Sequence, residues 1–82
     1  MTRDELLAWV RKRMAEVLEV DPERIQESTD FAELDADSID LIEVVNTMER
    51  EFDVHIDEQD LYDLENVGQL LDLLQQSVAQ RG

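Results

Sequence analysis

Near the amino terminus, apolar residues recur at three- and four-residue spacing. This spacing is typical of an amphipathic helix, which we expect from about Thr2 to Leu18. Thr2 and Glu5 stand three residues apart, as in a capping box, and mark the start of the helix. The buried stripe expected on this helix consists of Leu7, Val10, Met14 and Val17, widened by Leu6 and Leu18.

The same spacing predicts two further long helices. One begins near Asp37 and Ser38 and ends near Phe52. The other begins after Asn66, with Gln69 as its capping-box partner. The buried positions expected on them are Leu41, Val44, Val45, Met48 and Phe52 on the first, and Val67, Leu70, Leu71, Leu74 and Val78 on the second.

The connection between the first two long helices, residues 19–37, follows no helical period. An aspartate before a proline predicts one short helical turn over Asp21–Ile25. Phe31 and Leu34 are the apolar residues expected to pin the connection to the core. A connection of this length is either functional or carries local structure of its own.

A short third helix is predicted at about Glu58–Asp63, with Asp57 as its cap. Short connections between amphipathic helices are typical of antiparallel bundles. The predicted fold class is therefore all-α: a small antiparallel four-helix bundle with three longer helices and one short one, and a long loop between helices one and two. With 82 residues, the chain is expected to form a single domain over residues 1–82.

The composition favours a folded chain. Hydrophobic residues make up 43% of it, and only 2 Gly and 1 Pro interrupt the pattern, which argues against intrinsic disorder. No apolar run approaches the ~20 residues of a membrane-spanning helix. The amino terminus also lacks the basic-then-apolar pattern of a signal peptide. We therefore expect a cytoplasmic protein without a membrane span.

The charge is strongly acidic and unevenly distributed. Seven bases face 22 acids, for a formal net charge of −15, which argues against nucleic acid and anionic membrane as partners. Residues 27–65 alone hold 15 acids and one base, Arg50. A one-sided field attracts basic partners, so this segment predicts a surface for proteins with basic patches. The alternative is an acidic surface that serves solubility alone.

Catalytic constellations fail on spacing. The chain has no cysteine, so it offers no thiolate nucleophile or thiolate zinc site. Ser38 and His55 lie near opposite ends of a predicted helix about 21 Å long at ~1.5 Å per residue, which keeps them apart. A calcium loop starting at Asp35 lacks the required glycine and most of the oxygen ligands. We predict that the chain is not an enzyme and has no dedicated metal site.

Ser38 opens a predicted helix directly after Asp37. One interpretation is helix capping, because both side chains accept hydrogen bonds from first-turn amides. A second interpretation follows from the positive end of the helix dipole, which would favour a phosphodiester esterified to Ser38. No base accompanies the serine, so another enzyme would have to install such a group.

The stretch Phe31–Phe52, FAELDADSIDLIEVVNTMEREF, resembles the modification segment of acyl carrier proteins. The recognisable core is Asp37-Ser38-Ile39-Asp40, and the following DVHIDEQDLYDLENVGQLLDLL resembles the rest of that family's sequence. The resemblance implies a covalent 4′-phosphopantetheine arm on Ser38, flanked by Asp37. This arm would carry acyl groups as thioesters in fatty-acid or polyketide synthesis.

The resemblance also implies which residues meet partner enzymes. Glu43 and Glu49 would face Arg and Lys patches, and Asp40 would flank the modified serine. Ile39 and Ile42 would give apolar contacts beside the arm, in agreement with their place off the buried stripe. The implied partners are a phosphopantetheinyl transferase and acyl-transfer, condensing and tailoring enzymes with basic patches, and the chain itself is expected to be a monomer.

Three positions depart from the family pattern. Asp35 stands where glycine is common, Arg50 where an acid is usual, and Asp57 where proline is frequent. They leave open whether the chain serves general fatty-acid synthesis or a specialised pathway. Three other hypotheses also stay open: an aminoacyl or peptidyl carrier, an unmodified acidic interaction module in which Ser38 is only a cap, and a weak binder of divalent ions.

Overall fold

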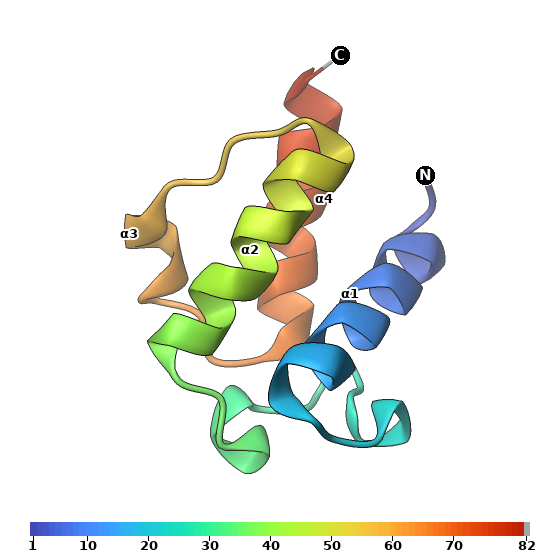
Figure 1. Ribbon diagram of the computed structural model, residues 1–82. Coiled ribbons are helices and arrows are strands. Elements are labelled where there is room, and N and C mark those ends of the chain that lie inside the picture. Colours follow the sequence, from blue (N-terminus) through green and yellow to red (C-terminus); the bar gives the residue numbers. More distant parts are fainter. Residues whose placement is uncertain (82) are drawn as a thin grey trace.

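Figure 1 shows the computed structural model, in which the longer helices pack around a shared core. It describes residues 1–81, and of Arg81 the backbone only. The elements in chain order are α1 (Arg3–Leu18), the 3₁₀ helices η1 (Pro22–Arg24) and η2 (Phe31–Leu34), α2 (Ser38–Phe52), α3 (Glu58–Leu61) and α4 (Val67–Arg81). The predicted all-α class, with three longer helices and one short one, is confirmed. No helix among these combines the length and the apolar character needed to cross a bilayer.

The helices are arranged around α1, which packs against both α2 and α4, while α3 packs against α2. In Figure 1, α1 runs in the opposite direction to α2 and α4. The last two run the same way, because the connection through α3 returns the chain to the end at which α2 began. The connection of residues 19–37 lies across that same end.

Capping boxes begin α1 and α4, as predicted. The Glu5 amide donates to Thr2 Oγ1 at 3.2 Å, and the Thr2 amide donates to Glu5 Oε1 at 3.0 Å. For α4, the Gln69 amide donates to Asn66 Oδ1 at 2.9 Å, and Gln69 Oε1 accepts in return from the Asn66 amide. These reciprocal bonds satisfy first-turn amides that have no partner within the helix.

The core follows the predicted stripes closely on α2 and less closely on α1. All five positions predicted on α2 are buried, as are four on α4, where Val78 is only half-buried. On α1 the buried residues are Leu6, Val10, Met14 and Ala15. Leu7 and Val17, which were predicted in the buried stripe, are only half-buried and pack against the edge of the core. Because α2 and α4 together cover α1, spacing alone does not locate the centre of its buried surface.

The long connection carries local structure and is paired to the segment before α4. Its η1 helix lies within the predicted Asp21–Ile25 turn, and Phe31 and Leu34 are buried as expected. The Phe31 amide donates to Glu65 O at 2.9 Å, and the Val67 amide, the first of α4, donates to Thr29 O at 3.1 Å. These backbone bonds hold the loop against the start of α4, and with it the residues that lead into α2.

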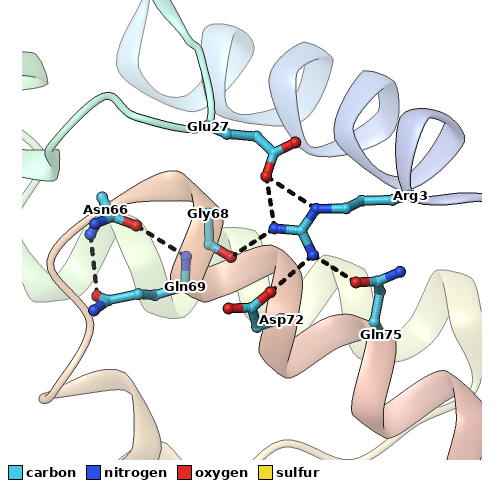
Figure 2. A network of polar contacts seen from close by, with 7 residues as sticks. All are labelled: Arg3, Glu27, Asn66, Gly68, Gln69, Asp72 and Gln75. Atoms are coloured by element: carbon cyan, nitrogen blue, oxygen red, sulfur yellow. Dashed lines mark hydrogen bonds and ion pairs between the residues drawn. The ribbon is translucent and has the colours of Figure 1, made fainter.

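Gly68 and Arg3 complete this attachment (Figure 2). The Gly68 amide donates to Glu27 O at 2.8 Å, and a Cβ added at Gly68 would lie only 3.1 Å from that oxygen. Arg3 donates to Glu27 Oε1 from Nε (2.9 Å) and Nη2 (2.6 Å), to Asp72 Oδ1 at 2.8 Å, and also to Gln75 and the Gly68 carbonyl. The hydrogen bond to Glu27, followed by that to Asp72, raises the pKa of Arg3. One side chain of α1 thus ties the loop to α4.

α3 begins at Glu58 as predicted, but its end and its cap differ from the prediction. The helix ends at Leu61 rather than Asp63, and the Asp57 side chain makes no capping hydrogen bond. Instead, Asp57 Oδ1 lies 3.0 Å from His55 Nε2. The His55 side chain is itself exposed at the surface.

Candidate functional site

Ser38 is the first residue of α2 and is exposed to solvent. The preceding residue, Asp37, caps the helix: its Oδ1 accepts from the Asp40 amide at 2.9 Å. Asp40 Oδ2 in turn accepts from the Asp37 amide at 3.3 Å. Asp37 and Asp40 therefore flank the serine as a reciprocal capping box, so that capping of α2 does not depend on Ser38.

The backbone just before α2 is fixed by η2. Phe31 and Leu34 bury the turn in the core. Asp35 then adopts a left-handed conformation, with φ 55° and ψ 29°, and its amide donates to the carbonyl of Ala32 at 3.2 Å. The Ala36 amide returns to Phe31 O at 3.1 Å. A compact turn anchored to the core therefore presents Ser38 at the surface.

The surroundings of Ser38 favour a covalently attached anion. Among the described residues, no hydrogen bond engages its Oγ atom or the first two amides of α2, those of Ser38 and Ile39. Unpaired first-turn amides and the helix dipole stabilise negative charge at this end of a helix. The carboxylates of Asp37 and Asp40 oppose an anion, but both are turned toward backbone amides of the cap.

Among the residues that the structure describes, no general base is placed beside Ser38. His55 follows the far end of α2, where its Nδ1 lies 3.2 Å from Glu49 Oε2 and its Nε2 contacts Asp57. A serine without a base within hydrogen-bond reach is not an activated nucleophile. In the part of the chain that the structure describes, no three His, Asp or Glu side chains converge in a way that could hold a metal ion.

The residues predicted to meet partners fall into two groups. Ile39 and Glu43 are exposed, and Ile39 leaves 66% of its surface accessible, which is unusual for a large apolar residue. Ile42 is instead half-buried against the core, so the expectation that it is exposed was only partly right. Asp40 is half-buried and belongs to the cap. Of the two isoleucines, Ile39 thus offers the free apolar surface.

Glu49 has a structural role that the sequence analysis missed. Its side chain is only 23% exposed, and its Oε2 accepts a hydrogen bond from the Ile56 amide at 3.0 Å. The same oxygen faces His55. Glu49 therefore ties the end of α2 to the connector before α3. Its partner is a backbone amide beyond the helix end, and no local sequence pattern reports such a contact.

Comparison with known proteins defines the family. The family model described as "Phosphopantetheine attachment site" matches residues 8–74. An acyl carrier protein of Thermosynechococcus vestitus is 38% identical over 80 residues, which cover 96% of this chain and 99% of that protein. One from Phenylobacterium zucineum is 36% identical over 73 residues, covering 88% and 92%. The chain belongs to the acyl carrier protein family.

Solved structures agree with this fold. The crystal structure of an acyl carrier protein from Thermotoga maritima superposes with a TM-score of 0.88 at 29% identity, and the match covers 100% of this chain and 96% of the other. The HMG-ACPI domain from the CurA module of Lyngbya majuscula superposes with a TM-score of 0.79 at 23% identity, covering 99% and 83%. At that identity the second likeness speaks for the fold alone.

Membership of this family implies a covalently attached 4′-phosphopantetheine. Attachment through a phosphodiester needs an accessible hydroxyl in surroundings that tolerate negative charge. Ser38 offers both, because it is exposed and stands at the amino-terminal end of α2, a helix of 15 residues. The residues present therefore fit the group.

Proposed function

We propose that this protein is a carrier and not a catalyst, and that Ser38 is the attachment site of its 4′-phosphopantetheine. The observation that carries the proposal is the exposed, unengaged Ser38 hydroxyl at the start of α2. We also propose that residues 1–82 form one carrier domain. In support, the family match spans 8–74, and buried residues from all four α-helices join one core.

Attachment requires a second enzyme. The Ser38 oxygen attacks the phosphorus of coenzyme A that bears the pantetheine; a bond from Oγ to phosphorus forms, and the bond to the adenosine bisphosphate leaving group breaks. The serine proton passes to a base of the phosphopantetheinyl transferase, since this chain supplies none nearby. When bound, the arm supplies a thiol that holds acyl groups as thioesters.

The outer surface beside Ser38 supports a role in partner binding. Ile39 gives an apolar contact next to the attachment point, and Glu43 lies one helical turn further along α2. We propose that Glu43 and Asp40 meet basic patches on acyl-transfer, condensing and tailoring enzymes, and that Ile39 and the partly exposed Ile42 give apolar contacts beside the arm. Glu49 contributes to this surface through the position of the α2 end rather than through free charge.

The pathway we propose is fatty-acid or polyketide synthesis. In support, the relatives with 36–38% identity carry the name acyl carrier protein. A cytoplasmic location and a monomeric state are the corresponding expectations. Delivery of aminoacyl or peptidyl groups is the alternative cargo, and an unmodified interaction module is the alternative class of protein.

The test is intact-protein mass after incubation with coenzyme A and a broad-specificity phosphopantetheinyl transferase. Wild type is expected to gain the mass of one phosphopantetheine, and Ser38→Ala none. Because Asp37 rather than Ser38 caps α2, Ser38→Ala is expected to change the free energy of unfolding by less than about 0.5 kcal/mol.

The matched control is Ser28→Ala, which removes an exposed serine from the long connection and is expected to load as wild type does. If Ser38→Ala were loaded, the attachment site would have to be another hydroxyl, and the assignment of Ser38 would be wrong. No loading of folded wild type by several transferases would favour the unmodified interaction module.

A further inference from the structure

Along the solvent-facing side of α2, the charge of the side chains changes from one end of the helix to the other. Residues spaced by four, three and four positions share one face of a helix. On α2 this spacing joins Ile39, Glu43, Asn46 and Arg50, which we call the α2 outer face. All four are exposed, and the buried residues of the helix lie on the opposite side. The face begins next to Ser38 and ends at Arg50, in the last turn of the helix.

Charge changes sign along this face. Its side chains are apolar at Ile39, negatively charged at Glu43, polar and neutral at Asn46, and positively charged at Arg50. Arg50 is the sole base among residues 27–65, which hold 15 acids. Eleven residues separate Ile39 from Arg50, or about 16 Å at ~1.5 Å per residue. The backbone of Arg50 therefore lies at a set distance along the helix axis from Ile39, within an otherwise acidic segment.

The guanidinium of Arg50 is free to meet a partner. No hydrogen bond or ion pair joins it to another side chain within the described residues, and it lines a shallow surface hollow of about 600 Å³ with Asn46, Glu49 and Asp53. Glu49, its neighbour in sequence, is engaged by the Ile56 amide and His55. An exposed arginine presents a planar fork of donors that matches a carboxylate with two parallel hydrogen bonds.

From this geometry we infer that Arg50 is a specificity-determining residue of the α2 outer face. It selects partner enzymes that place a carboxylate about 16 Å from the recess that receives Ile39, and it disfavours partners whose docking surface is basic throughout. Like charges that face each other across an interface weaken binding of a wrong partner, whereas a carboxylate opposite Arg50 strengthens binding of the right one. The inference rests on the proposed carrier function, because it takes the α2 outer face as the docking surface.

The test uses a fatty-acid condensing enzyme whose docking surface bears only Lys and Arg. Its dissociation constant is measured with the unloaded protein at about 0.1 M salt. We expect Arg50→Glu to bind about tenfold more tightly than wild type, because repulsion becomes attraction. The matched control is Lys12→Glu, an equal charge reversal at an exposed position of α1, which is expected to change binding by less than about twofold.

A second arm locates the carboxylate. Single basic residues of the same enzyme surface are changed to Glu, and each variant is paired with wild type and with Arg50→Glu. At one enzyme position, the change to Glu is expected to strengthen the binding of wild type about fivefold. The same enzyme change is not expected to strengthen the binding of Arg50→Glu.

Equal effects of Arg50→Glu and Lys12→Glu would overturn the inference, because net charge alone would then explain them. The inference would also be overturned if Arg50 showed coupling to none of the enzyme positions, or if Arg50→Glu did not bind the enzyme at all. Failure of the proposed function is a different observation, since it appears as absence of loading at Ser38. The binding measurement does not depend on loading.

Discussion

Asp35 holds the left-handed backbone that turns the chain from η2 into α2. Its side chain is exposed, and its amide closes the turn onto Phe31 and Ala32. A left-handed conformation costs an L-residue roughly 1–2 kcal/mol, which glycine avoids and aspartate bears better than most. The conformation of the backbone, rather than any contact of the side chain, therefore sets which residues fit at the entrance to the Ser38 site.

Replacing Asp35 by glycine is expected to raise the free energy of unfolding by about 0.5–1 kcal/mol, since relief of backbone strain exceeds the added entropy of the unfolded chain. Asp35→Val is expected to lower it by about 1–2 kcal/mol, because a β-branched residue resists positive φ. Urea unfolding measures both. Asp35→Asn is the control for charge, and a gain in Asp35→Asn equal to that in Asp35→Gly would contradict the argument from backbone strain.

At the scale of elements, the start of α1 links stability to pH through Glu5. The hydrogen bond from the Thr2 amide, and after it the contact with the Thr2 hydroxyl, hold the pKa of Glu5 below its ordinary value. The folded state thus favours the ionised carboxylate. The resulting stabilisation is complete above the ordinary glutamate pKa of about 4.3 and is lost as pH falls through the lowered pKa.

Glu5→Gln isolates this effect, because glutamine keeps the capping geometry and removes the charge. Wild type is expected to be more stable than Glu5→Gln at pH 7, and the difference is expected to vanish once the pH falls below the lowered pKa of Glu5. Urea unfolding of both proteins at each pH gives the difference, in which the titration of the other acids cancels. A difference that stays constant between the two pH values would refute the link between Glu5 ionisation and folding.

The helices could be predicted from the sequence because their signals are local. Apolar spacing and residue pairs three apart, such as Thr2 with Glu5, report a helix and its start within one or two turns. The attachment of the long loop has no such signal. The bonds from Arg3 to Glu27 and Asp72 join residues far apart in the chain, and the close approach of Glu27 O to Gly68 is likewise a long-range contact.

The same contrast holds at the candidate site. The place of Ser38 at the start of α2 followed from Asp37 and the onset of the apolar period. The half-burial of Ile42 did not, because packing of α3 against α2 decides how much of the α2 flank is covered. The role of Asp57 was also missed, since the nearby His55 takes the carboxylate that would otherwise cap α3.

At the scale of the whole molecule, stability and charge oppose each other. The formal net charge of −15 is confined within principal extents of 33 × 25 × 20 Å, and most of it lies on residues 27–65. Among the described residues, a single small core of mainly Leu, Ile, Val, Met and Phe side chains offsets this repulsion. The same field brings basic partners to α2 quickly, so the feature that favours encounter also weakens the fold.

Salt is therefore expected to stabilise the protein. The Debye length falls from about 30 Å at 0.01 M to about 3 Å at 1 M, from the size of the whole molecule to less than the spacing of helices. We expect NaCl over this range to raise the free energy of unfolding by about 1 kcal/mol, or the melting temperature by about 4–8 °C. Thermal unfolding followed by circular dichroism measures the slope. Neutralising two exposed acids of α3, with Glu58→Gln and Asp60→Asn, should flatten it, and an unchanged slope in that variant would mean that self-repulsion is not what salt relieves.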